Sequence, residues 1–262
     1  MREQLVRESV EQAAGAWRAM VAPLPGAVLI DDGRLSVSIA GTPHFVLNTV
    51  TLTQPLTAED LPAAVRSAKR YAAGCPAPWL LITCDEWLPP GAAEVLAGEG
   101  FVPVFPTTGM AARVVAPPRR AVPGELEIRT GAGEEMTRTL MDVNSHAYGM
   151  PPEIGRASIR PGLFTNDVWC AAGYVGGEAV SVAATYRVGD CLYVAWVATM
   201  PDARGKGYAE AVMRRSLADG TASTGITRTV LHATAMGQPL YTSMGYEPVT
   251  GFTFHGFGLA HD

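Results

Sequence analysis

Along the first half of the chain, the spacing of apolar residues alternates between that of a helix and that of a strand. Residues 2–21 carry apolar side chains at helical spacing and are followed by Pro23 and Pro25, which predicts a helix that ends before these prolines. Residues 31–34, Asp-Asp-Gly-Arg, are typical of a hairpin turn. The other predicted elements are strands at 27–30, 35–39, 45–52 and 79–83, helices at 57–73 and 91–97, and two strands between Phe101 and Val115.

The second half of the chain repeats this alternation with longer strands. Gly176-Gly177 and Gly189-Asp190 are typical of tight turns, so three successive antiparallel strands are expected around them. A loop rich in proline and glycine is predicted at 149–162. The predicted strands are 126–129, 168–175, 178–188, 191–199, 229–233 and 249–256, and the predicted helices are 133–148, 208–218 and 238–244. Together these elements predict a mixed α/β (α+β) protein.

A proline-rich, charged stretch separates the two halves. The residues from Ala116 to Gly124, Ala-Pro-Pro-Arg-Arg-Ala-Val-Pro-Gly, show neither helical nor strand spacing. We therefore expect a linker at 117–124. It would join a smaller α/β domain at 1–116 to a second domain at 125–262 that contains a mixed, largely antiparallel sheet flanked by helices.

Composition narrows the class of protein without naming a chemistry. Hydrophobic residues make up 48% of the chain and charged residues 17%, as in globular proteins, and the net charge of -5 argues against nucleic acid as a partner. The apolar runs are short and the N-terminus does not resemble a signal peptide, so we expect a cytoplasmic protein with no membrane partner. The four cysteines form no CxxC pair, so no metal site is expected.

The two halves share a short repeat. In the first half a predicted strand and helix lead to Gly100-Phe101-Val102-Pro103-Val104. In the second half the same order of elements leads to Gly245-Tyr246-Glu247-Pro248-Val249. Repetition of this kind predicts a duplicated unit. The alternative for residues 1–116 is an unrelated small α/β domain.

The sharpest local motif is Arg204-Gly205-Lys206-Gly207-Tyr208-Ala209, between a predicted strand and a predicted helix. Unpaired amides at a helix start favour phosphate, and glycines let an anion approach the backbone. A dinucleotide fingerprint would need a third glycine where Glu210 stands, and a P-loop would need Ser or Thr in place of Gly207. Alone, the motif predicts only that an anion binds at a helix start.

Two linked motifs resemble those of the GNAT superfamily of acyl-CoA-dependent N-acyltransferases. The segment from Arg204 to Ala209 matches the family's Gln/Arg-x-x-Gly-x-Gly/Ala signature. The segment Leu240-Tyr241-Thr242-Ser243-Met244-Gly245-Tyr246 is similar to the family's Leu-Tyr-x-x-x-Gly-Phe ending. The resemblance covers residues 125–258 and implies a GNAT-like fold there, with acetyl-CoA or another acyl-CoA as co-substrate.

The resemblance also implies which residues bind the acyl-CoA. The pantetheine arm would pair with the backbone of Val197, Ala198 and Thr199. Thr234 stands where the family has an asparagine, which weakens one expected contact to the co-substrate. The pyrophosphate would lie on the amides of the loop and of the helix start, which are those of Arg204, Gly205, Lys206, Gly207, Tyr208 and Ala209, with Glu210 just inside the helix.

Tyr241 is the residue to which the resemblance assigns chemistry. Its hydroxyl would be the acid that helps the CoA thiolate leave, after a base has taken a proton from the attacking amine. The structural alternative is a half-buried tyrosine that packs beside Gly245. No serine or cysteine lies in a recognisable nucleophile motif, so we expect direct transfer without a covalent acyl-enzyme.

The acceptor side of the site is less clearly marked. His146 and Tyr148 lie in the segment that covers the acceptor in the resembling family, so they are expected to shape the choice of substrate. No general base stands out from the sequence, and the candidates are Glu153, Asp167, Glu178, His146 and His232.

The first half carries neither part of this site. Leu96 stands opposite Tyr241 in the repeat, and no Arg-Gly-x-Gly loop occurs before residue 120. The sequence therefore predicts a degenerate GNAT-like first half and one acyltransferase site, most simply for acetyl transfer to an amine of a small molecule or peptide. Two alternatives use the same fold, namely decarboxylation of a malonyl thioester and CoA binding by a regulator without catalysis.

Overall fold

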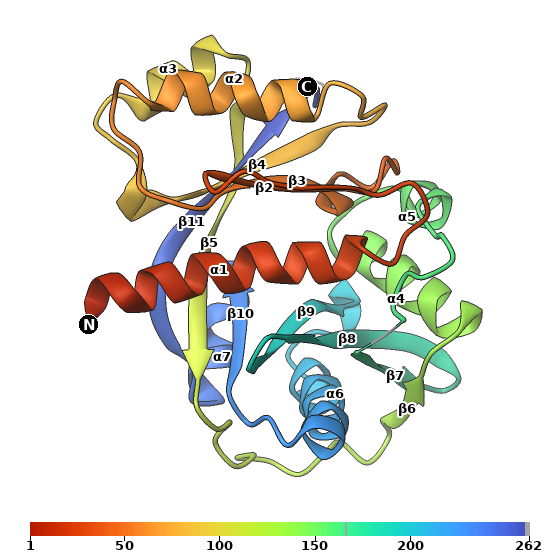
Figure 1. Cartoon of the computed structure of the whole chain (residues 1–262). Coiled ribbons are helices and arrows are strands. Elements are labelled where there is room, and N and C mark those ends of the chain that lie inside the picture. Colours follow the sequence, from red (N-terminus) through yellow and green to blue (C-terminus); the bar gives the residue numbers. More distant parts are fainter. Residues whose placement is uncertain (166, 260–262) are drawn as a thin grey trace. The chain divides into compact units, whose positions relative to one another are not determined.

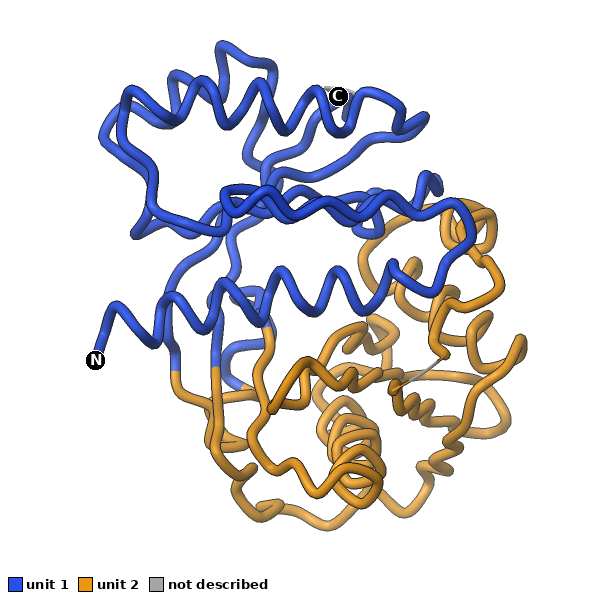
Figure 2. Tube along the Cα trace, in the orientation of Figure 1, with its two compact units in different colours: residues 1–110, 232–239, 248–262 blue, residues 111–231, 240–247 orange. Residues whose placement is uncertain are grey.

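The computed structural model describes residues 1–165 and 167–259, and the chain divides into two compact units (Figures 1 and 2). Unit 1 contains residues 1–110, 232–239 and 248–262, and unit 2 contains residues 111–231 and 240–247. Strands β5 (Val102–Ala112), β10 (Thr229–Ala233) and β11 (Glu247–Phe257) contribute residues to both units. The domain boundary predicted at 117–124 stays a prediction, and residues 260–262 of the predicted second domain lie outside the described residues.

The sheet of unit 1 combines strands from both ends of the chain. Its strand order is β1-β2-β3-β4-β11-β5. Strand β4 is antiparallel to β11, with Trp79 opposite Phe257 and Cys84 opposite Phe252. The last strand of the chain therefore completes the sheet of the unit that contains the N-terminus. The N-terminal strands are β1 (Val28–Asp31), β2 (Leu35–Ile39) and β3 (Asn48–Leu52), which are successively antiparallel, and β4 (Trp79–Cys84), which is parallel to β3.

Helices cover both faces of this sheet (Figure 1). Helix α1 (Arg2–Val21) lies on one face, and α2 (Leu61–Tyr71) and α3 (Ala92–Gly98) lie on the other. Alternation along β2 explains the division, because Leu35 and Val37 belong to the apolar cluster that also contains the buried side chains of α2 and α3.

Unit 2 has a sheet with the strand order β10-β9-β8-β7-β6. Helices α4 (Glu134–Ala147) and α6 (Tyr208–Thr224) cover its two faces (Figure 1), and α5 (Pro152–Ala157) and α7 (Gln238–Ser243) are short. Strands β6 (Glu127–Gly131), β7 (Val168–Val175), β8 (Glu178–Val188) and β9 (Cys191–Thr199) are successively antiparallel, and β10 is parallel to β9.

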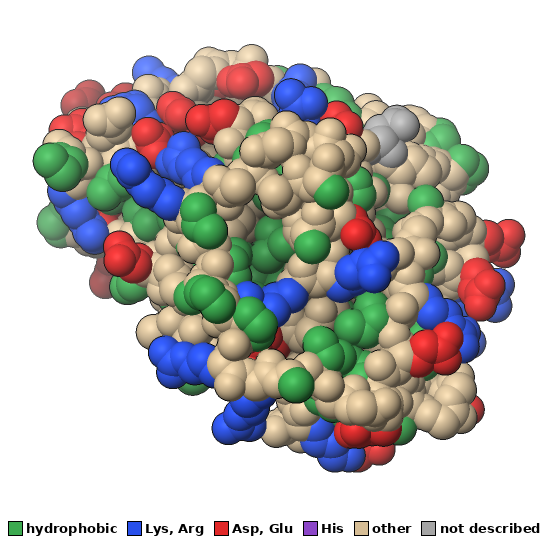
Figure 3. All heavy atoms as spheres, turned by 90° about the horizontal axis from the view of Figure 1, so that it is seen from below, with side chains coloured by type: hydrophobic (Ala, Val, Ile, Leu, Met, Phe, Trp, Pro, Cys, Tyr) green, Lys and Arg blue, Asp and Glu red, His purple; other side chains and the backbone are tan. Residues whose placement is uncertain are grey.

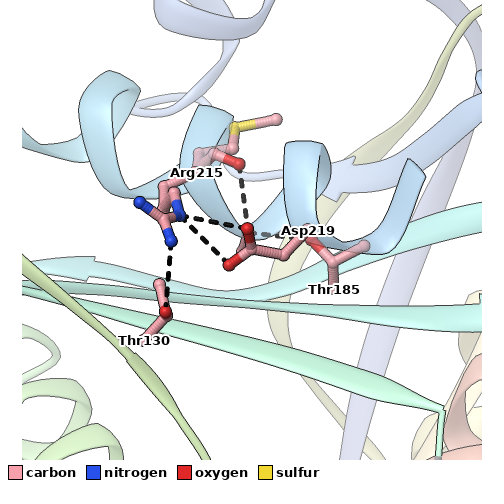
Figure 4. A network of polar contacts seen from close by, with 6 residues as sticks. Thr130, Thr185, Arg215 and Asp219 are labelled. Carbon is pink, nitrogen blue, oxygen red and sulfur yellow. Dashed lines mark hydrogen bonds and ion pairs between the residues drawn. The ribbon is translucent and has the colours of Figure 1, made fainter. Parts of the chain in front are cut away.

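Polar contacts hold α6 against this sheet (Figure 4). Arg215 forms an ion pair with Asp219 one turn further along α6, at 3.0 Å, and its Nη2 donates a hydrogen bond to Thr130 Oγ1 of β6 at 3.5 Å. The hydroxyls of Thr185 on β8 and Ser216 on α6 are buried and 2.8 Å apart. A buried hydroxyl pair contributes about 1 kcal/mol. These contacts fix the position of α6 and with it the loop that precedes the helix.

The mixed α/β class is confirmed, but the prediction of two strands between Phe101 and Val115 is wrong. Strand β5 is continuous from Val102 to Ala112. Gly109 lies within this strand and provides space there, since a Cβ would lie 2.5 Å from Ser9 Oγ and 2.9 Å from the Phe252 ring.

Two further local predictions need correction. The strand expected at 45–52 begins with a 3-10 turn, η1 (Phe45–Leu47), and becomes extended only at Asn48. The loop expected at 149–162 contains α5, because Pro152 stands in the first turn, where a helix tolerates proline. Gly155 lets α5 approach α4 closely, since a Cβ there would lie 3.2 Å from the Met141 carbonyl oxygen.

Lysine and arginine side chains and acidic side chains are both spread over the face drawn in Figure 3. None of the helices in the described part of the chain is long and apolar enough to cross a bilayer. Two other 3-10 turns, η2 (Asp85–Trp87) and η3 (Pro201–Ala203), precede α3 and α6.

Candidate functional site

Strand β9 has an open edge beyond its middle. Its parallel pairing with β10 runs over three residues and ends at Val194 opposite Leu231. Beyond that pair, β9 continues from Ala195 to Thr199, and no strand among the described residues pairs with this stretch on that side. Exposed edge amides and carbonyls pair readily with an extended ligand. Val197, Ala198 and Thr199 all lie in this stretch, as the sequence predicted for a pantetheine arm.

A bulge turns the strand at the same place. Trp196 and Val197 together lie opposite Ala183 of β8, because the register shifts between the flanking pairs. Trp196 has a φ of 56°, which is uncommon for a bulky residue, and its ring is held edge-on by Phe164 at 5.3 Å. The bulge separates the open part of β9 from the part that pairs with β10.

The loop that follows β9 ends in an uncapped helix start. Gly205 and Gly207 have φ values of 77° and 86°, in the left-handed region that favours glycine. Gly207 is the N-cap of α6 and provides no side-chain cap, and the first backbone hydrogen bond of the helix runs from Ala211 N to Gly207 O at 3.2 Å. The amides of Tyr208, Ala209 and Glu210 therefore have no partner within the helix. An anion at this point would meet these donors and the positive end of the helix dipole.

A small apolar cluster lies beneath the loop and positions it. Met200 and Val180 pack against this cluster at the end of β9 and the start of β8. On the outer side, Tyr208 Oη donates a hydrogen bond of 2.6 Å to Glu125 Oε1. This bond lowers the pKa of the Glu125 carboxyl and raises the pKa of Tyr208. The buried members of the cluster are Leu126, Ala203, Tyr208 and Ala211.

Two side chains tie the end of α4 to the open edge of β9. Arg204 donates from Nη2 to Ala147 O at 2.7 Å and from Nε to Thr199 O at 3.3 Å. Tyr148 Oη donates to Val197 O at 3.3 Å, while 56% of its side chain is exposed. The guanidinium of Arg204 therefore braces the loop, so the loop amides and Lys206 are the groups left to face an anion.

Tyr241 lies close to this edge in the same unit. Its side chain is 7% exposed, and its ring meets Tyr246 edge-on at 6.1 Å. Burial raises the pKa of Tyr241, and the hydroxyls of Tyr148 and Tyr246 raise it further. Within the part of the chain that the structure describes, its own hydroxyl makes no hydrogen bond. A phenol in this state is a neutral donor without a bound acceptor.

The other predicted residues are less closely grouped. Glu210 forms an ion pair with Arg214 on the same helix, at 2.8 Å, which offsets its negative charge near the helix start. His146 is exposed in the last turn of α4. Thr234 belongs to unit 1, where its carbonyl accepts hydrogen bonds from the amides of Gly237 and Gln238 before α7.

The candidates for general base also differ in their surroundings. Glu153 and Glu178 are exposed, at the starts of α5 and β8. Asp167 has a φ of 50° and its backbone carbonyl accepts a hydrogen bond from Arg187 N. His232 belongs to unit 1, where its ring meets Trp17 and Phe252, and burial lowers its pKa to about 3. No candidate is singled out by these contacts.

Sequence reasoning missed three contributors to the site. Trp196 forms the bulge, but a tryptophan within an apolar strand carries no signal for one. Tyr148 was expected only as an acceptor residue, although its hydroxyl bonds the strand edge. Glu125 was placed only at a domain boundary, whereas its carboxylate accepts the bond from Tyr208.

The comparison with families of known domains identifies this region. Residues 132–249 match the acetyltransferase (GNAT) domain. This chain contains a GNAT acetyltransferase domain. The match covers the predicted phosphate loop and Tyr241, which belong to unit 2. The recognition made from the sequence is therefore confirmed for the family and for the fold.

Solved structures extend the likeness in fold to most of the chain. A GCN5-related N-acetyltransferase from Kribbella flavida is similar with a TM-score of 0.66 and 19% identity, over 95% of this chain and 96% of that chain. A functionally unknown conserved protein from Staphylococcus epidermidis gives a TM-score of 0.64 at 12% identity, over 90% of this chain and 95% of that one.

A tandem GNAT protein from the clavulanic acid biosynthesis pathway is also similar, with a TM-score of 0.56 and 13% identity over 97% of this chain and 96% of that chain. At these identities the likeness concerns the fold alone. The comparison with curated proteins gives no match. The GNAT fold of this chain thus extends beyond the matched domain, and its substrate must be inferred from its own residues.

Proposed function

We propose that the GNAT domain transfers an acyl group, most simply acetyl, from acyl-CoA directly to an amine of a small molecule or peptide. One observation carries the proposal. The open edge of β9, the uncapped start of α6 and the buried Tyr241 all belong to unit 2. They suit three successive parts of an acyl-CoA, which are the amide-containing pantetheine arm, the pyrophosphate and the thioester sulfur.

Acyl transfer requires a proton donor at the thioester end of the path that the acyl-CoA would take along β9 and the start of α6. The amine nitrogen forms a bond to the thioester carbonyl carbon while the carbon–sulfur bond breaks, and the sulfur leaves with the electron pair. Tyr241 would donate its hydroxyl proton toward that sulfur. Because burial raises the pKa of Tyr241, the phenol stays neutral and able to donate throughout the neutral pH range.

The same arrangement explains how the acyl-CoA would be held. The amides of Tyr208, Ala209 and Glu210 would bind the pyrophosphate, and the exposed Lys206 would add positive charge. Tyr148 lies at the edge of this path and next to Tyr241, so it would contact the acyl end of the donor or the acceptor. The base that receives the amine proton stays among the predicted candidates, and the proposed location is the cytoplasm.

Ligand-dependent stability tests this function most directly. The full chain is melted with acetyl-CoA, CoA or NAD, each at the same concentration. Acetyl-CoA at about 100 times its Kd is expected to stabilise the fold by about 2.7 kcal/mol, and NAD is expected to have no effect. Release of free thiol from acetyl-CoA in the presence of an amine panel then measures turnover. A chain that no CoA thioester stabilises would contradict the proposal.

A further inference from the structure

The linker predicted at 117–124 is tied to the rest of unit 2 at its first end. Ala116 N donates to Met244 O at 2.8 Å, and Ala116 O accepts from Arg214 Nη1 at 2.7 Å. A Cβ on Gly245 would lie 3.2 Å from the Ala116 Cβ, so the corner after α7 packs on this residue as well. Ala116, just before the linker, therefore lies against the second turn of α6.

The other end of the linker is tied to the first residues of the same helix. Glu125 accepts the 2.6 Å hydrogen bond from Tyr208. Pro123 Cγ lies 3.9 Å from the position that a Cβ on Gly207 would take. We call residues 116–125 the strap. It runs from Arg214 back to Gly207 and ends beside the loop amides.

The strap is longer than the stretch of helix between its two anchors. Residues Gly207 and Arg214 are about 10 Å apart along α6, because a helix rises about 1.5 Å per residue. The strap could span roughly three times that distance if it were extended. Three prolines, at 117, 118 and 123, limit its conformations.

Arg119 and Arg120 lie in the middle of the strap, between its two anchors. Both are exposed, and neither makes an ion pair or a hydrogen bond within residues 1–165 and 167–259. Of the arginines that contact the loop and the strap, Arg204 bonds two carbonyls and Arg214 pairs with Glu210. The strap thus carries two guanidinium groups without an acidic partner, shortly before the end that contacts Gly207 and Tyr208.

We propose that Arg119 and Arg120 bind the 3′-phosphate of the CoA nucleotide and so distinguish CoA from donors that lack this phosphate. The inference rests on the proposed function. If the pantetheine arm runs along β9, the nucleotide leaves the loop in the opposite direction, past Gly207 and Tyr208. The strap borders the loop on that side.

The chemistry of the two groups is complementary. A terminal phosphate carries close to two negative charges, and a guanidinium can donate two parallel hydrogen bonds to its oxygens. A strap restricted by prolines loses less conformational freedom on binding than a flexible loop would. The arginines act on affinity for the donor and lie outside the reacting groups, so they should not affect the chemical step.

The affinities for two alternative acyl donors, one with and one without the 3′-phosphate, test this assignment. Titration calorimetry compares acetyl-CoA with acetyl-dephospho-CoA on the full chain, on the double variant R119Q/R120Q and on the charge-matched control R66Q/R70Q, which alters exposed arginines of α2 in unit 1. The unmodified chain should bind acetyl-CoA about tenfold more tightly than acetyl-dephospho-CoA. R119Q/R120Q should bind both donors with the weaker affinity, and the control should keep the tenfold difference.

Two readouts separate this inference from the proposed function. Raising the ionic strength from about 0.05 M to about 0.5 M should reduce the preference of the unmodified chain, since exposed charges are screened. Equal binding of both donors by the unmodified chain, or an undiminished preference in R119Q/R120Q, would overturn the role of the strap and leave the acyltransferase intact. Failure of the unmodified chain to bind either donor would instead overturn the proposed function, and the strap assignment with it.

Discussion

Two loops of equal length join a strand to a helix in the two units, and only one of them suits an anion. Eight residues separate β3 from α2 in unit 1, and eight separate β9 from α6 in unit 2. In unit 2 the loop ends with two left-handed glycines and an uncapped helix start. The first amides of the helix have no partner within it, and Lys206 stands between the two glycines.

The loop of unit 1 is closed by its own contacts. Leu56 N donates to Trp87 O at 3.2 Å, and Asp60 N donates to Thr57 Oγ1 at 3.1 Å. Glu59 and Asp60 stand directly before the helix, where their carboxylates favour the helix dipole and would repel a phosphate. The turn before the helix therefore carries two glycines and a lysine in unit 2 and two carboxylates in unit 1, so only that of unit 2 suits an anion.

The strands before the two loops differ in how far they continue past their parallel pairing. Each pairs in parallel with its neighbour over three residues. Strand β3 ends one residue after its last pair, at Leu52, whereas β9 runs on for five residues past Val194 and bulges at Trp196. An open strand edge thus exists in unit 2 and is lacking in the described part of unit 1 at the matching place.

The corner after the last helix of each repeat is alike in backbone. Phe101 N donates to Leu96 O at 3.0 Å, and Tyr246 N donates to Tyr241 O at the same distance. The intervening Gly100 and Gly245 have φ values of 87° and 91°. The repeats therefore share the backbone geometry of the corner, while the position of Tyr241 in unit 2 is taken by Leu96 in unit 1. The same backbone can thus carry a phenol hydroxyl in one unit and an inert side chain in the other.

Loss of the Tyr241 hydroxyl should have the largest effect. Tyr241→Phe keeps the ring and its packing on Tyr246 but removes the proposed acid, so kcat should fall by about 10²-fold or more. Leu96→Met at the matching corner of unit 1 should leave kcat unchanged. Steady-state rates with the best amine and the affinity for acetyl-CoA are measured together. Unchanged turnover in Tyr241→Phe would show that the corner of unit 2 is as inert as that of unit 1.

The second-largest effect is expected from acid, which should destabilise unit 1 more than unit 2 because the histidines with lowered pKa values lie in unit 1. Burial lowers the pKa of His44 and of His255 to about 4. The unfolded chain takes up protons below about pH 6.5 and the folded chain does not, so stability is full above that pH and falls as the pH drops toward 4. At pH 5 each histidine should cost roughly 2 kcal/mol.

Hydrogen exchange at pH 7 and pH 5, corrected for the intrinsic rates, measures this difference. Protection of β2, β3 and β4 should fall more than that of β7 and β8. Replacing the exposed His146 by Ala should not alter the difference, whereas His44→Gln should reduce it. A uniform loss of protection in both units would contradict the assignment of acid sensitivity to unit 1.

Two N-cap glycines offer a matched test of the loops. Gly207 before α6 and Gly91 before α3 have nearly the same φ, 86° and 81°. Alanine at either position should cost roughly 1–2 kcal/mol of stability, because a left-handed backbone is unfavourable for it. Only Gly207→Ala should also weaken acetyl-CoA binding, by about tenfold, since it distorts the amides that would meet the pyrophosphate. Equal affinities in the two variants would remove the loop of unit 2 from the site.

The smallest effect is expected at the anchor of the strap. Glu125→Gln replaces a charge-assisted hydrogen bond to Tyr208 by a neutral one and should weaken acetyl-CoA binding about threefold. Glu127→Gln is the control, since Glu127 is also exposed and pairs with Arg129 on β6. If both variants bind acetyl-CoA like the unmodified chain, the anchor contributes nothing to the loop.

Local spacing in the sequence determined most of the elements and the family of the second half. Glycine, proline and apolar periodicity act within a few residues, so α1, β7, β8 and the start of α6 could be read from the chain. The loop at 204–209 and Tyr241 followed from short motifs for the same reason, and the matched acetyltransferase domain contains both.

Only the tertiary structure decided which distant segments meet. The pattern of β11 marks a strand but does not name β4 as its neighbour, because a strand's partner depends on long-range packing. The bulge at Trp196 needs the register of β8, α5 needs the surface of α4 beneath Gly155, and the strap needs Met244 and Tyr208 as anchors. Each of these depends on a contact between residues far apart in the chain, which spacing along the sequence does not encode.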